Sequence, residues 1–197
     1  MTRTATMRIL VLAAGMSCGT GAQASGILTP AQTEGTTRFA LLGAVIFDQS
    51  SETLGGPGDE TVLMARATLG IAPKADVFFE LSNFGDRTFG GGLKVALAQG
   101  RRGAVGFFGR VLWSKPEGEL EDDQISGTGA FLINADLLGQ KPYLGFVVQG
   151  FSSEELSGGD SIKTSAVAGI QMSGLPLVIE TNLGVDKLLA IGARLAF

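Results

Sequence analysis

Two glutamates, Glu80 and Glu180, are the strongest acid–base candidates in this chain, because the sequence contains no histidine. Histidine supplies the usual general base near neutral pH, and a Ser-His-Asp arrangement cannot form without it. The two glutamates fall on the third and ninth predicted strands, which we do not expect to touch. The one cysteine, Cys18, lies in a predicted leader, so zinc ligands are also lacking. We therefore predict a non-enzymatic protein with no catalytic residue, no metal and no cofactor.

The two glutamates are better explained as partners of buried cations, because a lone charge is costly to bury. Arg66, Glu80 and Lys94 follow one another at equal intervals, and the midpoints fall inside predicted turns. Cross-strand neighbours in a hairpin have this spacing. Glu180 and Arg194 repeat the same interval near the end of the chain. We predict a cation–anion–cation ladder of Arg66, Glu80 and Lys94, and a second pair of Glu180 with Arg194.

Strands must position these side chains, because the chain after residue 35 consists of short stretches of alternating hydrophobicity separated by Gly, Pro, Asp, Ser and Asn. Glycine makes up 30 of 197 residues, which is unusual for a helix-rich protein. We predict an all-β fold of about ten strands, with about eight or twelve as alternatives. The predicted strands are 36–47, 61–71, 76–84, 88–98, 103–113, 124–134, 142–151, 161–172, 175–185 and 188–197.

The length and alternation of these strands fit a membrane. Leu63 and Leu69 share one face of their strand, and Arg66 lies on the other. Eleven residues rise by about 36 Å, and a tilt of about 45° reduces this to roughly 25 Å, the height of the apolar band of an outer-membrane barrel. No segment after the leader is long and apolar enough to cross as a helix. We predict a transmembrane, up-and-down antiparallel β-barrel, because only helices and closed barrels satisfy their backbone in lipid.

A water-soluble secreted barrel that binds a small apolar ligand is the alternative function, with the apolar faces turned inward. Its outer surface would need roughly a quarter to a third charged residues. The predicted strands place only eight charged residues on the polar face, with Asp76, at a strand start, counted with the turns, and this small number suits a lumen better. The eight are Arg38, Arg66, Glu80, Lys94, Arg110, Lys163, Glu180 and Arg194.

The lumen itself has two interpretations. Six basic against two acidic residues predict a net positive interior, which favours a narrow, hydrated passage that attracts anions weakly. Leu42, Ile46, Phe108 and Leu112 share the inner face and favour a plugged, structural barrel instead. Ten strands leave little room, since the diameter grows with strand number. Both the pore and the plug remain open at this point.

The first 24 residues predict a cleaved signal peptide. Arg3 and Arg8 precede an apolar stretch, and Ala22-Gln23-Ala24 is a small-x-small cleavage pattern. The remaining chain divides into an N-terminal periplasmic segment, 25–35, and a barrel, 36–197. Loss of the two arginines changes the net charge from −4 to −6, so a nucleic-acid partner is not expected.

The longer connections, expected on the extracellular side, are acidic. Acidic clusters can collect divalent cations, which could bridge to the phosphates of lipopolysaccharide. A solvated charge run is the simpler alternative. Trp113, at the end of its strand, is typical of the aromatic girdle at a membrane interface. The acidic cluster consists of Glu117, Glu119, Glu121, Asp122 and Asp123.

The last strand carries a family resemblance. The chain ends on Phe197, with Leu195, Ile191 and Leu189 at alternate positions before it, and Ala193 between them. This end resembles the terminal strand signal of the Gram-negative outer-membrane β-barrel superfamily. The resemblance implies delivery by periplasmic chaperones, insertion by the barrel assembly machinery and a place in the cell outer membrane among its lipids and lipopolysaccharide. Within that superfamily we expect a small monomer acting as a narrow porin-like pore or a structural protein.

Overall fold

The computed structural model describes residues 27–48, 60–84, 86–115, 124–152, 161–172, 175–184 and 188–197. These residues form ten β-strands, close to the predicted ranges. The strands are β1 (Phe39–Asp48), β2 (Glu60–Ala72), β3 (Ala75–Phe84), β4 (Asp86–Gly100), β5 (Gly103–Lys115), β6 (Gln124–Ala135), β7 (Gln140–Ser152), β8 (Ser161–Met172), β9 (Leu177–Gly184) and β10 (Leu188–Ala196).

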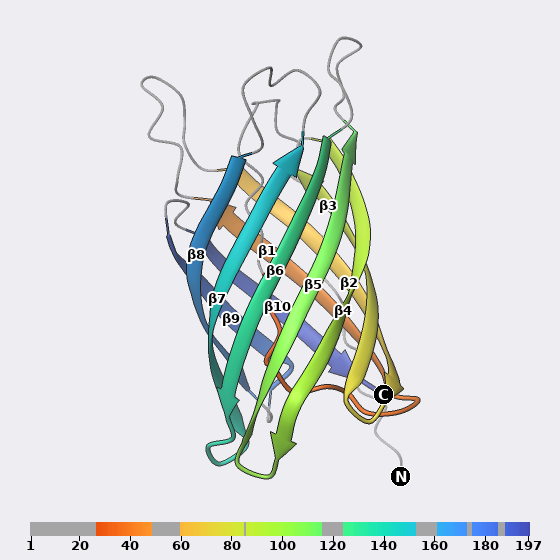
Figure 1. Ribbon diagram of the computed structural model, residues 1–197, viewed down its shortest axis with the longest axis vertical. Coiled ribbons are helices and arrows are strands. Elements are labelled where there is room, and N and C mark those ends of the chain that lie inside the picture. The colour runs from red at the N-terminus through yellow and green to blue at the C-terminus, as the bar shows by residue number, and fades with distance from the viewer. Residues whose placement is uncertain are drawn as a thin grey trace, which may run out of the picture.

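The strands form a closed antiparallel barrel in which each pairs with its neighbours in the chain. The first and last strands close it, from Ala40 opposite Ala196 to Asp48 opposite Leu188. The predicted ten-stranded up-and-down barrel is confirmed (Figure 1). No helix in the described residues is long and apolar enough to span a membrane. We call the end with the short connections 73–74, 101–102 and 136–139 the turn end, and the opposite end the loop end.

The outward face of the barrel is apolar along the strands. Phe79 is 50% exposed, Leu144 65% and Ile162 70%, although each lies within a regular strand. The predicted alternation is confirmed on β2, where Leu63 and Leu69 are exposed and Arg66 is buried. On the outward strand positions that the structure describes, charged side chains occur only at Arg87 and Lys115, both at the loop end.

The inward face is packed with side chains. One apolar cluster lies against β1, β2, β7, β9 and β10, and a second lies against β3 and β5 to β8. Phe78 and Phe108 stack inside the barrel with ring centroids 4.9 Å apart. Glycine makes room for such rings: a Cβ at Gly92 would lie 2.6 Å from the Phe78 ring, so this position on β4 must lack a side chain.

Candidate functional site

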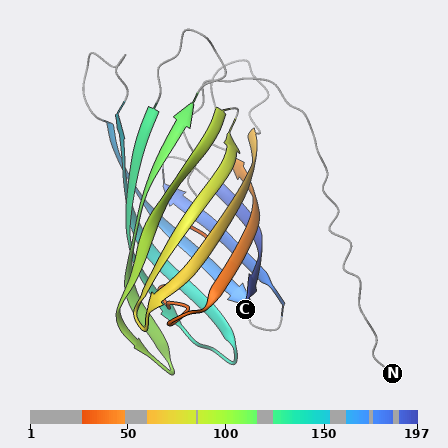
Figure 2. The ribbon, with the colours of Figure 1, turned by 90° about the vertical axis from the view of Figure 1, so that its right-hand side faces the viewer.

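The centre of the molecule is occupied by its own N-terminal segment, residues 27–34. Ile27, Leu28 and Ala31 are at most 1% exposed and belong to the two interior clusters. Figures 1 and 2 show this red-orange segment inside the barrel wall toward the turn end, immediately before β1. The sequence assigned residues 25–35 to the periplasm, and the described part of that range contacts the barrel interior.

One end of the N-terminal segment is held by Glu180 of β9. The backbone N–H groups of Ile27 and Leu28 donate to the two carboxylate oxygens of Glu180, each at 2.6 Å. The hydroxyl of Tyr143 donates to the same carboxylate at 2.6 Å. Arg66 donates to the carbonyl oxygen of Ile27. A buried carboxylate with three donors is well satisfied, so Glu180 works as a clamp on the segment.

The other end of the segment is held near the turn end by three different strands. Residues 32–34 present successive backbone N–H groups to acceptor side chains of the wall, at 3.0–3.1 Å. The Glu34 carboxylate also forms an ion pair with Arg194. The segment therefore binds through its backbone as well as its side chains. The wall acceptors are Asn134 for Gln32, Gln99 for Thr33 and Asp76 for Glu34.

Glu80 lies between two arginines. Arg66 Nη2 is 2.6 Å from Glu80 Oε2, and Arg110 Nη1 is 2.8 Å from Glu80 Oε1. The Arg66 guanidinium also lies 4.9 Å from the centre of the Phe78 ring, in a cation–π contact. All three charged side chains are at most 4% exposed. The predicted Arg66–Glu80 contact is present, and Glu80 forms an ion pair with a second cation, as predicted.

That second cation is Arg110 rather than the predicted Lys94. The β3–β4 pairing is centred two residues earlier than we predicted, so Glu80 faces Gly90 and Lys94 faces Asp76. Lys94 Nζ lies 3.2 Å from Asp76 Oδ2 and donates to Thr29 Oγ1 of the N-terminal segment. Arg110 reaches Glu80 from β5 across β4, where Gly90 lies opposite Glu80 and Gly92 lies opposite Arg110.

The predicted pair of Glu180 with Arg194 is wrong for the same reason. The β9–β10 pairing is also centred two residues early, so Glu180 faces Ala190. The backbone N–H of Arg194 donates to the carbonyl of Pro176, the residue immediately before β9. Both charges instead bind the N-terminal segment, one at each end of it.

The charge balance of the lumen also differs from the prediction. Arg38, predicted to face inward, precedes β1 and is exposed. Two acids outside the predicted set, Asp76 and Glu34, join the buried network. With these changes the set contains five basic and four acidic side chains, so the predicted surplus of four positive charges is wrong. Lys163 is half-buried and faces Gln149 on β7.

The two glutamates proposed as acid–base candidates are both engaged in hydrogen bonds inside the barrel. Each carboxylate oxygen of Glu80 and Glu180 already accepts from a named donor. Glu80 and Glu180 bind different partners, so the geometry offers no acid–base pair. Within the described residues, no group of three or more His, Cys, Asp or Glu is placed to hold a metal ion.

The terminal residues proposed as an assembly signal complete the barrel. Leu189, Ile191 and Leu195 face Phe47, Val45 and Leu41 on β1. Phe197 is 71% exposed and stacks on Phe39 with ring centroids 6.3 Å apart. The predicted signal peptide and the acidic cluster 117–123 lie outside the described residues.

Sequence reasoning missed the residues that bind the N-terminal segment. Asp76 was assigned to a turn, and Tyr143, Asn134 and Gln99 were not singled out. One signal was available, because Asp76 and Lys94 are as evenly placed about residue 85 as Arg66 and Glu80 are about residue 73. No pattern marks the segment itself, which is too short to show a period.

Replacing Tyr143 by Phe tests the clamp on the segment. The change removes one hydrogen bond to a buried carboxylate and keeps the ring, so the free energy of unfolding should fall by about 1.5–3 kcal/mol. Urea unfolding in lipid vesicles, followed by the fluorescence of the single tryptophan, Trp113, measures it. Thr164→Val, which removes a hydroxyl from an exposed position of β8, is the matched control. A loss no greater than that of the control would contradict the clamp.

Comparison with known proteins adds little to these observations. No protein-family model matches the chain, and no curated protein is significantly similar to it in sequence. Among solved structures, the outer membrane protein OprG from Pseudomonas aeruginosa is similar at 12% identity, over 86% of this chain and 99% of the OprG chain, with a TM-score of 0.25. The fold class therefore rests on the closed strand pairing of this chain itself.

Proposed function

We propose that this chain is a non-enzymatic β-barrel of the bacterial outer membrane whose lumen is closed by its own N-terminal segment. The observation that carries the proposal is the distribution of charge across the wall. Buried charges line the inside, while large apolar side chains cover the outside. This is the reverse of a water-soluble protein and matches a barrel in lipid.

A soluble barrel would have to expose these outward apolar side chains, which we call the apolar belt, to water. Contiguous apolar patches of more than a few hundred Å² are rare on soluble monomers. Here the exposed large apolar residues occur on every strand. Within the described part of the chain, the N-terminal segment and the ion network occupy the interior, where a small-ligand carrier would need an apolar cavity. The alternative of a soluble carrier is therefore disfavoured.

The filled lumen favours a structural, closed barrel over an open pore. Ile27 and Leu28 are buried near mid-height, where Arg66 and Glu180 also lie. An ion crossing the barrel would have to displace this segment and break its hydrogen bonds. The charged wall behind it would line a passage if the segment left.

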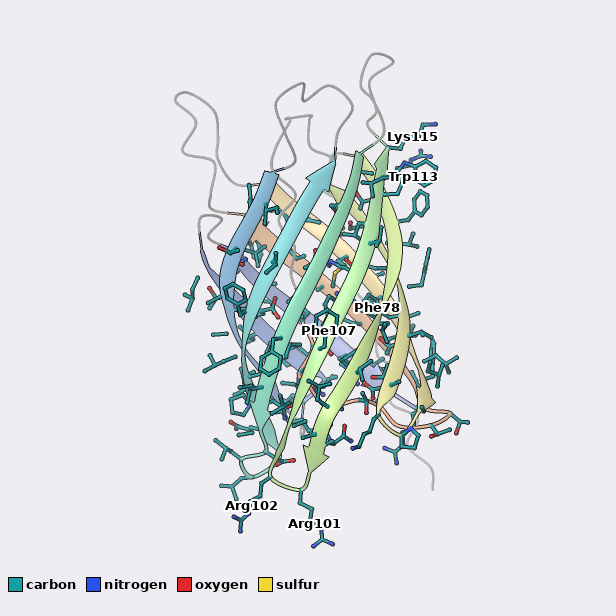
Figure 3. The ribbon with its side chains drawn as sticks, in the orientation of Figure 1. Phe78, Arg101, Arg102, Phe107, Trp113 and Lys115 are labelled. Atoms are coloured by element: carbon teal, nitrogen blue, oxygen red, sulfur yellow. The ribbon has the colours of Figure 1, made fainter. Side chains whose placement is uncertain are left out.

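The proposal includes a route of export and membrane insertion. The signal peptide is removed after Ala24, and chaperones deliver the chain to the barrel assembly machinery, which recognises the strand ending in Phe197. The barrel then lies in the outer membrane as a monomer, with the loop end outside. In this orientation the basic turn residues Arg101 and Arg102 face the periplasm (Figure 3).

A charge introduced into the apolar belt tests the membrane location. Phe107 points outward from the middle of β5 (Figure 3). Phe107→Arg should lower the stability of the inserted barrel by about 2–4 kcal/mol, the cost of an arginine near the bilayer midplane. Leu138→Arg, in the fully exposed turn between β6 and β7, is the control and should change stability little.

The measurements are membrane fractionation, the heat-dependent gel shift of a folded barrel, and urea unfolding in vesicles. The wild-type protein should fractionate with the outer membrane and need detergent for extraction. Recovery as a detergent-free monomer, or equal stability of the two arginine variants, would contradict the membrane proposal.

A further inference from the structure

The outward face of the barrel carries a small amphipathic surface at the loop end of β2 to β5. Arg87 on β4 faces Lys115 on β5, and both side chains are exposed. One step toward the turn end, Phe89 faces Trp113, with ring centroids 5.3 Å apart. Figure 3 shows Trp113 and Lys115 at the loop end of β5, pointing away from the barrel.

Beside this surface lies an apolar groove on the outer wall, of about 550 Å³. Large side chains form its sides, and Ala65 forms a low point between them. Arg87 belongs to the same lining, so a cation lies beside an apolar hollow. The large apolar side chains of the groove are Leu63, Phe79, Leu81 and Phe89.

The grouping of these residues matches an amphiphile. The two cations lie nearer the loop end than the aromatic pair, and the apolar groove extends from Arg87 and Phe89 across β3 to β2. A phosphate group would meet Arg87 and Lys115, while an acyl chain of the same molecule would lie in the groove. Arginine and lysine bind phosphate through charge-assisted hydrogen bonds, and aromatic side chains prefer the headgroup level.

We infer that this surface is a binding site for a phosphate-bearing, acylated glycolipid of the outer leaflet, of the lipopolysaccharide type. The inference rests on the proposed membrane function, which places the loop end in that leaflet. Charge complementarity selects the occupant, because the two cations are the only charged residues on the outward strand positions that the structure describes. A neutral lipid would offer these two cations no counter-charge.

Displacement of a quenching lipid measures this binding directly. The full mature chain is reconstituted in vesicles of phosphatidylcholine with brominated acyl chains, which quench the single tryptophan, Trp113. Lipid A without bromine is then titrated in. Binding at the site should remove brominated chains from Trp113 and restore its fluorescence. Dephosphorylated lipid A should restore it far less.

Two pairs of variants locate the site. R87Q/K115Q should weaken lipid A binding roughly thirtyfold, since each cation beside an anionic lipid contributes about a fivefold factor. R101Q/R102Q removes the same charge from the turn end, where both side chains are exposed (Figure 3), and should leave binding unchanged. Ala65→Phe, which fills the groove, should also weaken binding, whereas Ala166→Phe on the outward face of β8 should not.

The outcomes separate this inference from the proposed function. Equal recovery with phosphorylated and dephosphorylated lipid, or equal effects of the two arginine-containing pairs, would overturn the site while the protein remains inserted. Failure of the wild-type chain to insert into the vesicles would instead contradict the proposed function.

Discussion

Deletion of residues 27–34 is expected to turn a closed barrel into a conducting one. Planar-bilayer recordings of the wild-type protein should show no steady channel, whereas the deletion variant should give small, long-lived conductance steps. The physical reason is that the segment fills the lumen and pairs with the wall through Glu180, Asp76 and Arg194. Without it, water and ions reach a wall already lined with charge.

The selectivity of the opened barrel can also be predicted. The segment carries Glu34 away with it, which leaves Arg194 without its ion-pair partner. The revised set of inward charges then contains five basic and three acidic side chains. We expect a weak preference for anions, measured as the reversal potential in a salt gradient. A cation preference would contradict this charge assignment.

Add-back of the segment distinguishes an opened barrel from a damaged one. A synthetic peptide of residues 25–35 should close the deletion variant and raise its melting temperature, because the wall binds the backbone of the segment as well as its side chains. A scrambled peptide of the same composition is the control. Equal conductance in wild-type and deleted proteins, or no closure by the native peptide, would contradict the plug.

Replacing Glu80 by Gln should have the second large effect. The change leaves Arg66 and Arg110 buried beside a neutral amide, and breaking a buried ion pair by removing one partner costs about 3–5 kcal/mol. Urea unfolding in vesicles, followed by Trp113 fluorescence, measures the loss. Glu34→Gln is the matched control, because its pair with Arg194 is more exposed and should matter less.

A double substitution tests whether the loss comes from uncompensated charge. Glu80→Gln combined with Arg110→Gln removes one charge of each sign, so it should be less destabilising than the sum of the two single changes. Additive losses, or an unchanged melting temperature for Glu80→Gln alone, would show that the Arg66–Glu80–Arg110 cluster does not stabilise the barrel.

The fold was predictable from the sequence because each strand carries its own evidence. On β2 the alternation of Leu63, Arg66 and Leu69 identifies the apolar face of the strand from its own sequence, without information from the neighbouring strands. The Arg66–Glu80 contact was predictable as well, because the midpoint of the two residues, 73, falls inside the connection 73–74 between β2 and β3. Local pattern and a tight turn are enough for such a pair.

The register of the other hairpins was not predictable at this precision. A turn centre displaced by two residues preserves the face of every side chain and changes every partner, as Lys94 and Asp76 show. Alternation is unaffected by such a shift, so it cannot detect it. The contact of Glu80 with Arg110 crosses β4 and therefore depends on the registers of three strands together.

The amino-acid sequence by itself determined the strands, their number and the two faces of the wall, because these depend on a period of two within each segment. Only the tertiary structure decided what fills the lumen. Ile27 and Leu28 belong to no segment of alternating hydrophobicity. Glu180, which accepts from their backbone N–H groups, and Tyr143, which donates to Glu180, both lie more than a hundred residues away in the chain. Such contacts exist only after the barrel closes around the segment.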